Sequence, residues 1–159
     1  MTPPEIRLRP LEVDDAEAMV EVLADPSLYD FTGDTPPSRD ELDRRYAAQV
    51  RGRSGDGAEE WLNFIIVAPG GQPVGYVQAT IPAAGGAAEI AWVVGAPWQG
   101  RGVGTRAAGM LVELLAHRGV TRLVAHIHPE HLASERIAAK LGFRPTDAVV
   151  DGERRWLKG

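Results

Sequence analysis

WQGRGVG, residues 98–104, is the stretch that decides how the rest of the chain is interpreted. It follows an apolar run, AEIAWVVGAP, and precedes an apolar pattern of helical spacing that starts at Val103. Glycine lowers helix stability relative to alanine, so three glycines at a helix start need a compensating role. The first turn of a helix carries unpaired N–H groups and the positive end of the helix dipole, and bare glycines let a phosphate approach them. The stretch therefore predicts a phosphate-binding turn, to which Gln99 and Arg101 can add side-chain donors.

Three other interpretations of this stretch compete. A plain strand-to-helix turn normally needs only one glycine. A P-loop requires Lys followed by Ser or Thr after the last glycine, whereas this chain has Thr105-Arg106. A dinucleotide fingerprint requires the third glycine three residues after the second, and the spacing of Gly100, Gly102 and Gly104 does not fit. Phosphate binding at the start of a helix is the interpretation that we favour.

Composition narrows the class of protein. The chain has 159 residues, no cysteine and a formal net charge of -5. Disulfides, thiolate metal sites and a cysteine nucleophile are excluded. Runs of Lys or Arg are absent, as are a signal-peptide core and a long apolar span, so we expect neither a nucleic-acid nor a membrane partner. We expect a cytoplasmic protein, and the many Ala, Gly, Arg and Pro residues are typical of a GC-rich, bacterial genome.

The order of hydrophobic patterns predicts one domain over residues 1–159, of the α+β or mixed α/β class. Strands are predicted at IRLRPL, WLNFIIVA, PVGYVQATI, AEIAWVVGAP and LVAHIH, with a closing hairpin around Asp151-Gly152. Helices are predicted at residues 13–25, from Ser38 to near Gly52, from Val103 to near Gly119, and at ASERIAAKLGF. Asp14 with Glu17, and Ser38 with Glu41, have the spacing of capping boxes.

At this point the chain resembles the GNAT superfamily of N-acetyltransferases. QGRGVG matches that family's pyrophosphate loop, which is Gln or Arg, two free positions, Gly, one free position, and Gly or Ala. HPEHLASERIAAKLGF is similar to the segment that covers the pantetheine arm, PVGYVQ to the third strand, and IRLRPLEVDDAEAMVEVLAD, residues 6–25, to the first strand and helix. Arg-Leu-Arg-Pro near the start, Pro-Ser after the first helix and Ser134 resemble the branch of ribosomal-protein alanine acetyltransferases.

The resemblance implies a fold, a cosubstrate and a reaction. The fold is a mostly antiparallel sheet of about seven strands flanked by about four helices, with a splay between the fourth and fifth strands. The reaction is direct transfer of an acetyl group from acetyl-CoA to a primary amine, without a metal. The residues implied in binding acetyl-CoA are Trp92, Val93, Val94, Gln99, Gly100, Arg101, Gly102, Val103, Gly104, Thr105, His131 and Ser134.

Candidate catalytic groups follow from the chemistry of amine acetylation. A protonated amine must lose its proton before it attacks, so a base is needed. Glu89 is the first candidate, because a carboxylate stands there in an apolar strand; a water-facing strand start is the competing interpretation. His126 and His128 alternate in LVAHIH and are further candidates for a base. Without a third ligand they do not make a metal site. In the family, a backbone N–H near Val94 would polarise the acetyl carbonyl.

The segment that would cover pantetheine departs from the family at two positions. His131 stands where the family usually has Asn, and Ala138 where it often has the tyrosine that protonates the leaving thiolate. Ser134 is then a candidate proton donor, with a helix-capping serine as the competing interpretation. These departures leave two alternatives open: a non-catalytic acyl-CoA-binding or sensory module on the same fold, and a site for another phosphate-bearing ligand such as a nucleotide.

The amine is expected between the first two helices and the closing hairpin. Aromatic and acidic side chains there could line its site and attract a cation, and we expect a monomer or homodimer. The candidates are Tyr29, Phe31, Trp61, Tyr76 and Trp156, with Asp30, Asp34 and Glu153.

Overall fold

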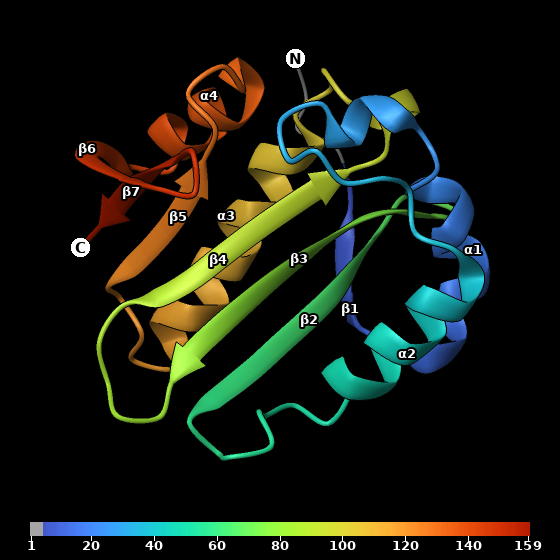
Figure 1. The fold of residues 1–159 in the computed structure, drawn as a ribbon, viewed down its shortest axis with the longest axis horizontal. Coiled ribbons are helices and arrows are strands. Elements are labelled where there is room, and N and C mark those ends of the chain that lie inside the picture. The colour runs from blue at the N-terminus through green and yellow to red at the C-terminus, as the bar shows by residue number, and fades with distance from the viewer. Residues whose placement is uncertain (1–4) are drawn as a thin grey trace.

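A computed structural model describes residues 5–159 of the chain. A single mixed sheet carries helices on both of its faces (Figure 1). The described residues form seven strands and four α-helices, which confirms the expected numbers. They are β1 (Arg7–Pro10), α1 (Ala16–Val22), α2 (Arg39–Gln49), β2 (Glu59–Val67), β3 (Pro73–Pro82), β4 (Ala88–Val94), α3 (Val103–His117), β5 (Leu123–Ile127), α4 (Leu132–Lys140), β6 (Arg144–Val150) and β7 (Glu153–Lys158).

The sheet order places β4 at its centre. The order is β1-β2-β3-β4-β5-β7-β6, and every neighbouring pair is antiparallel except β4 and β5. β4 and β5 pair only at Ala88 with Leu123 and at Glu89 with Val124. Beyond these pairs the two strands diverge (Figure 1). The predicted splay is confirmed, and it leaves one edge of β4 without a strand partner among the described residues.

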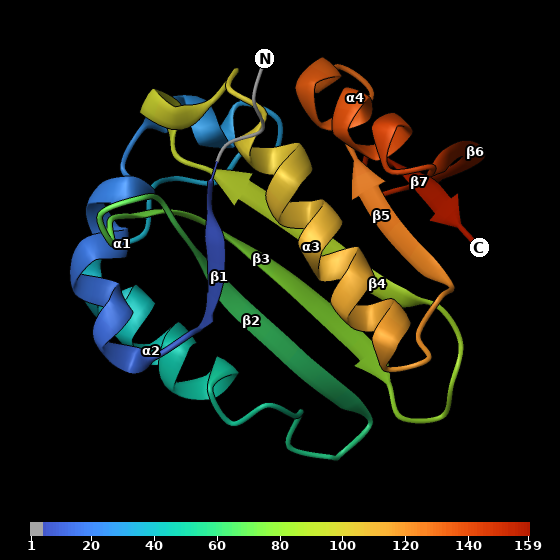
Figure 2. The same cartoon turned by 180° about the vertical axis from the view of Figure 1, so that it is seen from behind.

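Two hydrophobic cores flank the sheet. α3 crosses one face of the sheet, in front of β3 and β4 in Figure 2, and there Leu111 and Leu115 pack with Ile90 of β4. On the other face, Met19 of α1 and Leu42 of α2 pack against β2. Side chains alternate along β4 because successive residues of a strand point to opposite faces. The strand is therefore apolar on both faces at the centre of the sheet.

Caps and turns explain where several elements begin. Ser38 Oγ accepts from the Glu41 N–H at 3.1 Å, and Glu41 Oε1 accepts from the Ser38 N–H at 3.4 Å, so the predicted capping box is confirmed. The box predicted at Asp14 and Glu17 is wrong. A 3-10 turn, η1 (Val13–Asp15), precedes α1, and the Asp15 carboxylate caps it by accepting from the Glu12 N–H at 2.7 Å.

The closing hairpin is formed as predicted. β6 and β7 are joined by Asp151 and Gly152, which have φ angles of 52° and 81°. Two positive φ angles in a two-residue connection are those of a type I′ turn, whose twist matches that of the strands. The hairpin places β7 beside β5, so the carboxyl-terminal strands extend the sheet past the splay.

Candidate active site

A cleft of about 590 Å³ opens where β4 and β5 separate. Its walls come from four segments, residues 27–31, 92–94, 98–105 and 131–140. Trp92, Val93 and Val94 line it from β4. Trp92 and Val94 lie beyond the last β4–β5 pair, and their outward backbone N–H and C=O groups have no strand partner on that side among the described residues, whereas the backbone of Val93 faces Tyr76 of β3. The cleft thus joins an unpaired strand edge to the glycine-rich turn.

The three glycines of the turn serve two different purposes. Gly100 and Gly102 have φ angles of 75° and 79°, which residues with a side chain rarely adopt. Gly104 is inside α3, and a Cβ atom there would lie 2.8 Å from Ile137 Cδ1 of α4. Gly100 and Gly102 therefore shape the turn, whereas Gly104 lets α3 approach α4 closely.

The first turn of α3 presents free donors to the cleft. Gly102 is the N-cap residue and has no side chain to accept from the N–H groups that follow it. Val103, Gly104 and Thr105 line the cleft, and the first N–H groups of a helix have no partner within it. The helix has 15 residues and thus a developed dipole, so an anion is favoured at this end.

Gln99 and Arg101 were expected to add side-chain donors to a bound phosphate, but the structure shows both side chains in other positions. The Gln99 amide donates to the Val94 carbonyl at 2.9 Å, which ties the turn to the end of β4. Arg101 is exposed and is the residue of the segment 99–105 that does not line the cleft. The cations on the cleft wall are instead Arg136 and Lys140, on α4. Sequence reasoning missed both, although they are four residues apart and so lie on one helical face.

His131 and Ser134 form a small network at the start of α4. His131 caps the helix through Nδ1, which accepts from the Ser134 N–H at 3.3 Å. Ser134 Oγ lies 3.2 Å from His131 Nε2 and accepts from the Trp92 indole N–H at 3.3 Å. Burial lowers the pKa of His131, so the ring is neutral at pH 7, and with Nδ1 accepting its proton is on Nε2. Ser134 Oγ therefore accepts twice, and its own hydrogen is free to donate.

Glu89 is held by a histidine and stands at the point of divergence. His126 Nδ1 lies 3.1 Å from Glu89 Oε1, and Arg155 Nε lies 3.4 Å from His126 Nε2. The guanidinium can only donate, so His126 Nε2 accepts and its Nδ1–H donates to Glu89. The Glu89 side chain is 54% exposed, against 18% for His126. The Glu89 carboxylate is thus oriented by His126 and also open to solvent. It has features of both interpretations made from the sequence, a base candidate and a water-facing strand start.

His128 does not share this role. It lies beyond the end of β5, its Nδ1 accepts from the Glu130 N–H at 3.1 Å, and its ring packs on Phe31 with centroids 5.1 Å apart. Phe31 also packs on His131, at 4.9 Å. Within residues 5–159, three His, Asp or Glu side chains are nowhere grouped as a metal site would need. Helices long and apolar enough to cross a membrane are also missing from this part of the chain.

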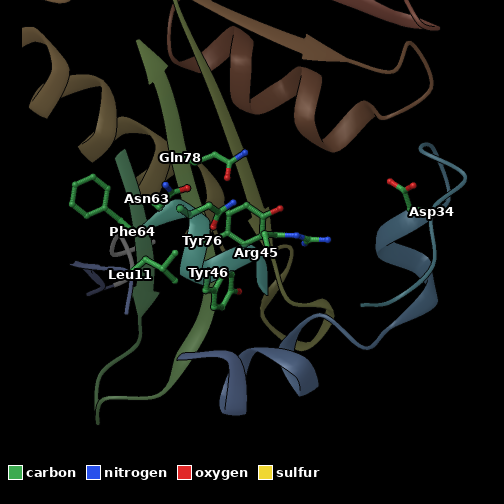
Figure 3. A pocket seen from close by; sticks show the side chains of 9 residues that line it. Leu11, Asp34, Arg45, Tyr46, Asn63, Phe64, Tyr76 and Gln78 are labelled. Atoms are coloured by element: carbon green, nitrogen blue, oxygen red, sulfur yellow. The ribbon is translucent and has the colours of Figure 1, made fainter. Parts of the chain in front are cut away.

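A second cavity, of about 340 Å³, lies beside the cleft (Figure 3). Its polar wall is formed by Arg45 and Tyr46 of α2, Asn63 of β2, and Tyr76 and Gln78 of β3. Tyr76 pairs with Val93 and Gln78 with Ala91, so the cavity is one strand away from the cleft wall. Asn63 and Gln78 could have indicated this cavity from the sequence, because each is an amide side chain inside an otherwise apolar strand.

The candidates named for the amine site are distributed over several places. Tyr76 and Asp34 line the second cavity, whereas Asp30 and Phe31 line the larger cleft. Trp156 is buried in the core with Ala125 and Phe143, and its indole N–H has no hydrogen-bond partner among the described residues. Trp156 is therefore a core residue, because it points from β7 toward the face covered by α3.

Solved structures with the same fold include acetyltransferases. Aminoglycoside acetyltransferase AAC(6')-Ib, solved with coenzyme A, is 22% identical with a TM-score of 0.79, over 98% of this chain and 94% of that one. RimL, a ribosomal-protein alpha-N-acetyltransferase also solved with coenzyme A, is 18% identical with a TM-score of 0.76, over 96% and 90%. An acetyltransferase from Thermus thermophilus is 24% identical with a TM-score of 0.74, over 99% and 97%. At these identities the likeness establishes the fold.

The family follows from the sequence itself. No curated protein sequence matches the chain significantly. Residues 5–144, however, match the acetyltransferase (GNAT) domain family. That match spans β1 to the start of β6 and includes the glycine turn, the splay and the start of α4. The resemblance recognised in the glycine turn is confirmed, and the chain belongs to the GNAT acetyltransferase family.

Proposed function

We propose that the chain is an acetyl-CoA-dependent N-acetyltransferase whose single domain, residues 1–159, transfers the acetyl group directly to a primary amine. One observation carries the proposal: the unpaired edge of β4 and the uncapped start of α3 open into the same cleft. A ligand with amide groups at one end and a diphosphate at the other matches this pair of features. The coenzyme A bound to AAC(6')-Ib and RimL supports that class of ligand.

The residues present fit coenzyme A in charge and in hydrogen bonding. The N–H groups of Val103, Gly104 and Thr105 would bind the diphosphate, with Lys140 and Arg136 adding positive charge. The backbone of Trp92 and Val94, which faces the open edge of β4, would pair with the pantetheine amides, and an N–H near Val94 would polarise the acetyl carbonyl. Acetyl-CoA supplies the activated thioester; the protein supplies its orientation.

Proton transfer is assigned to two groups of the chain. Glu89 accepts the ammonium proton, and the freed amine nitrogen forms a bond to the acetyl carbon while the carbon–sulfur bond breaks. The nitrogen then releases its second proton, which passes through the hydroxyl of Ser134 to the thiolate, so Ser134 ends neutral and the products are the amide and the coenzyme A thiol. Glu89 is three residues from Trp92, which is about 10 Å along a strand, so a chain of water molecules relays the ammonium proton. His126 positions Glu89 through the 3.1 Å hydrogen bond.

A non-catalytic acyl-CoA-binding module is the second candidate function. Ala138 occupies the position of the family's proton-donating tyrosine, and it is fully buried. Ala138 therefore offers no hydroxyl to protonate the leaving thiolate. That proton has to come through Ser134 or from solvent. Cytoplasmic location and a monomeric or homodimeric state stay predictions from the sequence.

Two measurements test the proposal. Calorimetric titration with coenzyme A should give a binding isotherm for the wild-type protein, and Gly102→Val should weaken binding at least tenfold, because a side chain would disturb the turn. Gly119→Val, at a φ angle of 81° just beyond the carboxyl end of α3 and away from the cleft, is the matched control for backbone strain. Acetyl-CoA consumption across protein N-termini, amino acids, polyamines and aminoglycosides then separates the candidates. Binding without turnover of any amine would favour the non-catalytic module, and no binding would reject both.

A further inference from the structure

The second cavity lies where an amine acceptor has to dock. Its floor is formed by Asn63, Tyr76 and Gln78, and the last two stand beside Val93 and Ala91 of β4 in the sheet. Adjacent strands are about 5 Å apart, so a molecule in this cavity reaches the β4 edge along which the acetyl group is proposed to lie. At about 340 Å³ the cavity is near the lower end of the range for small-molecule sites.

Hydrogen-bond donors gather at one end of this cavity. Arg45 and Tyr46 of α2 and Tyr76 of β3 line this cavity together (Figure 3). The positive charge of Arg45 opposes a rise in the pKa of either tyrosine, but burial is the larger influence on both. Burial nevertheless raises the pKa of both tyrosines, so the hydroxyls stay protonated and are available as donors. One cation and two hydroxyls therefore face the same space.

Arg45 has no carboxylate partner among the residues that the structure describes. The salt bridges within residues 5–159 join Arg9 to Asp15, Arg39 to Asp43, Arg118 to Glu60 and His126 to Glu89. The carboxylate on the cavity wall, Asp34, stands away from the strands in a separate loop (Figure 3) and is not within salt-bridge distance of Arg45. A planar guanidinium that is left unpaired beside two hydroxyl donors is suited to a ligand carboxylate.

We infer that the amine acceptor carries a carboxylate, which Arg45 binds together with the hydroxyls of Tyr46 and Tyr76. This inference rests on the proposed function and adds the substrate class: amino acids or short peptides with a free carboxylate. The Asn63 and Gln78 amides on the floor of the cavity can hydrogen-bond the acceptor nitrogen, and Gln78 stands beside Ala91 of β4, between Glu89 and the cleft wall. A single guanidinium balances one negative charge, and it disfavours a polyamine or another polycation in the same place.

A pair of probes that differ only in the carboxylate tests this class. Alanyl-alanine and alanyl-alanine amide are titrated calorimetrically into the protein saturated with coenzyme A, and are also assayed for turnover with acetyl-CoA. Wild-type protein should bind the free acid at least tenfold more tightly than the amide. Arg45→Gln should remove this difference, and Tyr76→Phe should reduce it. Arg44→Gln, which removes the same charge from the exposed neighbouring residue of α2, should preserve it.

The outcomes separate this inference from the proposed function. Equal binding of the two probes, preference for the amide, a preference that survives Arg45→Gln, or no binding of either probe would overturn the carboxylate assignment. Turnover of amines without a carboxylate preference would overturn it while leaving the acetyltransferase intact. Selective binding of the acid without any acetyl transfer would support the assignment and reject the catalytic proposal.

Discussion

Glu89 owes its position to two neighbours rather than to its own strand alone. Arg155 fixes the tautomer of His126, and His126 then orients the carboxylate, so the orientation depends on three strands, β4, β5 and β7. Such a chain leaves the Glu89 oxygens partly open to solvent while limiting their rotation. A general base needs both properties, because it must accept a proton and then release it to water.

Replacing Glu89 by Gln should lower kcat/KM for amine acetylation by about 100-fold or more, since general-base catalysis contributes about 10²–10⁴-fold. Coenzyme A affinity should be unchanged, because Glu89 does not line the cleft. Glu113→Gln, an exposed carboxylate on α3, is the control and should keep full activity. Steady-state kinetics with calorimetric titration measure both effects. A Glu89→Gln variant with undiminished kcat/KM would move the base elsewhere.

Gly104 and Ile137 make a contact that a double-mutant cycle can isolate. A Cβ at Gly104 would lie 2.8 Å from Ile137 Cδ1, and Ile137→Val removes that atom. Alanine is also a better helix residue than glycine. Gly104→Ala should therefore be more favourable by about 0.5–2 kcal/mol in the Ile137→Val background than in the wild-type background. Urea denaturation of the four proteins measures the coupling. A coupling energy of zero would mean that α3 and α4 move apart to accommodate the added methyl group without a cost in stability.

At the scale of elements, α4 begins on a histidine that has to be neutral. His131 caps the helix with an unprotonated Nδ1, and burial lowers its pKa below the ordinary value of 6.5. The unfolded chain then binds a proton more readily than the folded chain as the pH falls through this range, so acid favours unfolding. The helix start is consequently sensitive to pH between about 7 and 5.

The free energy of unfolding of the wild-type protein should fall between pH 7 and pH 5 more steeply than that of His131→Asn. Asparagine caps helices well and does not titrate, so the variant lacks this proton linkage. Urea denaturation at several pH values gives both slopes, and His117→Asn, at an exposed helix end, controls for the loss of a histidine. Parallel slopes for wild type and His131→Asn would show that the cap does not sense the proton.

Elements with local causes were predictable from the sequence, and those with distant causes were not. Ser38 with Glu41 and Asp151 with Gly152 act within a few residues, and both were predicted. The cap at α1 was misplaced because Arg9 of β1 binds Asp15 in a bidentate pair, at 3.1 and 2.7 Å, which holds residues 13–15 as a 3-10 turn, and α1 begins only at Ala16. The contact between Arg9 and Asp15 depends on how β1 and the turn η1 lie relative to each other in the folded chain, and no local sequence pattern indicates that arrangement.

The residues of the candidate site also fall into two groups, those with local sequence signals and those brought together only by the fold. The glycine turn and the apolar end of β4 were identified from the sequence, because backbone conformation and hydrophobic pattern are local signals. Arg45 was missed because it stands in RDELDRRYAAQ, where several charged residues look equivalent until the helix packs. The pairing of Glu89 with His126 joins residues 37 positions apart, so only the sheet reveals it.

On the scale of the whole molecule, coenzyme A should complete a gap in the sheet. Hydrogen–deuterium exchange should slow at Trp92 and Val94 when coenzyme A is added, since their amides face the unpaired edge of β4 and would gain partners. The start of α3 should also be protected, whereas β1 and β2, on the far side of the sheet, should change little. Mass spectrometry of peptides from these segments measures the difference. Protection of α3 without protection of β4 would place pantetheine away from the strand.

Within the described sheet, only two residue pairs connect the four amino-terminal strands to the three carboxyl-terminal ones. Under a mechanical load applied between β3 and β7, this short junction would part first, because few backbone hydrogen bonds share the force there. A molecule wedged along the gap would have to be pulled out as the junction opens. The cosubstrate would then raise the rupture force of the protein as well as its resistance to heat.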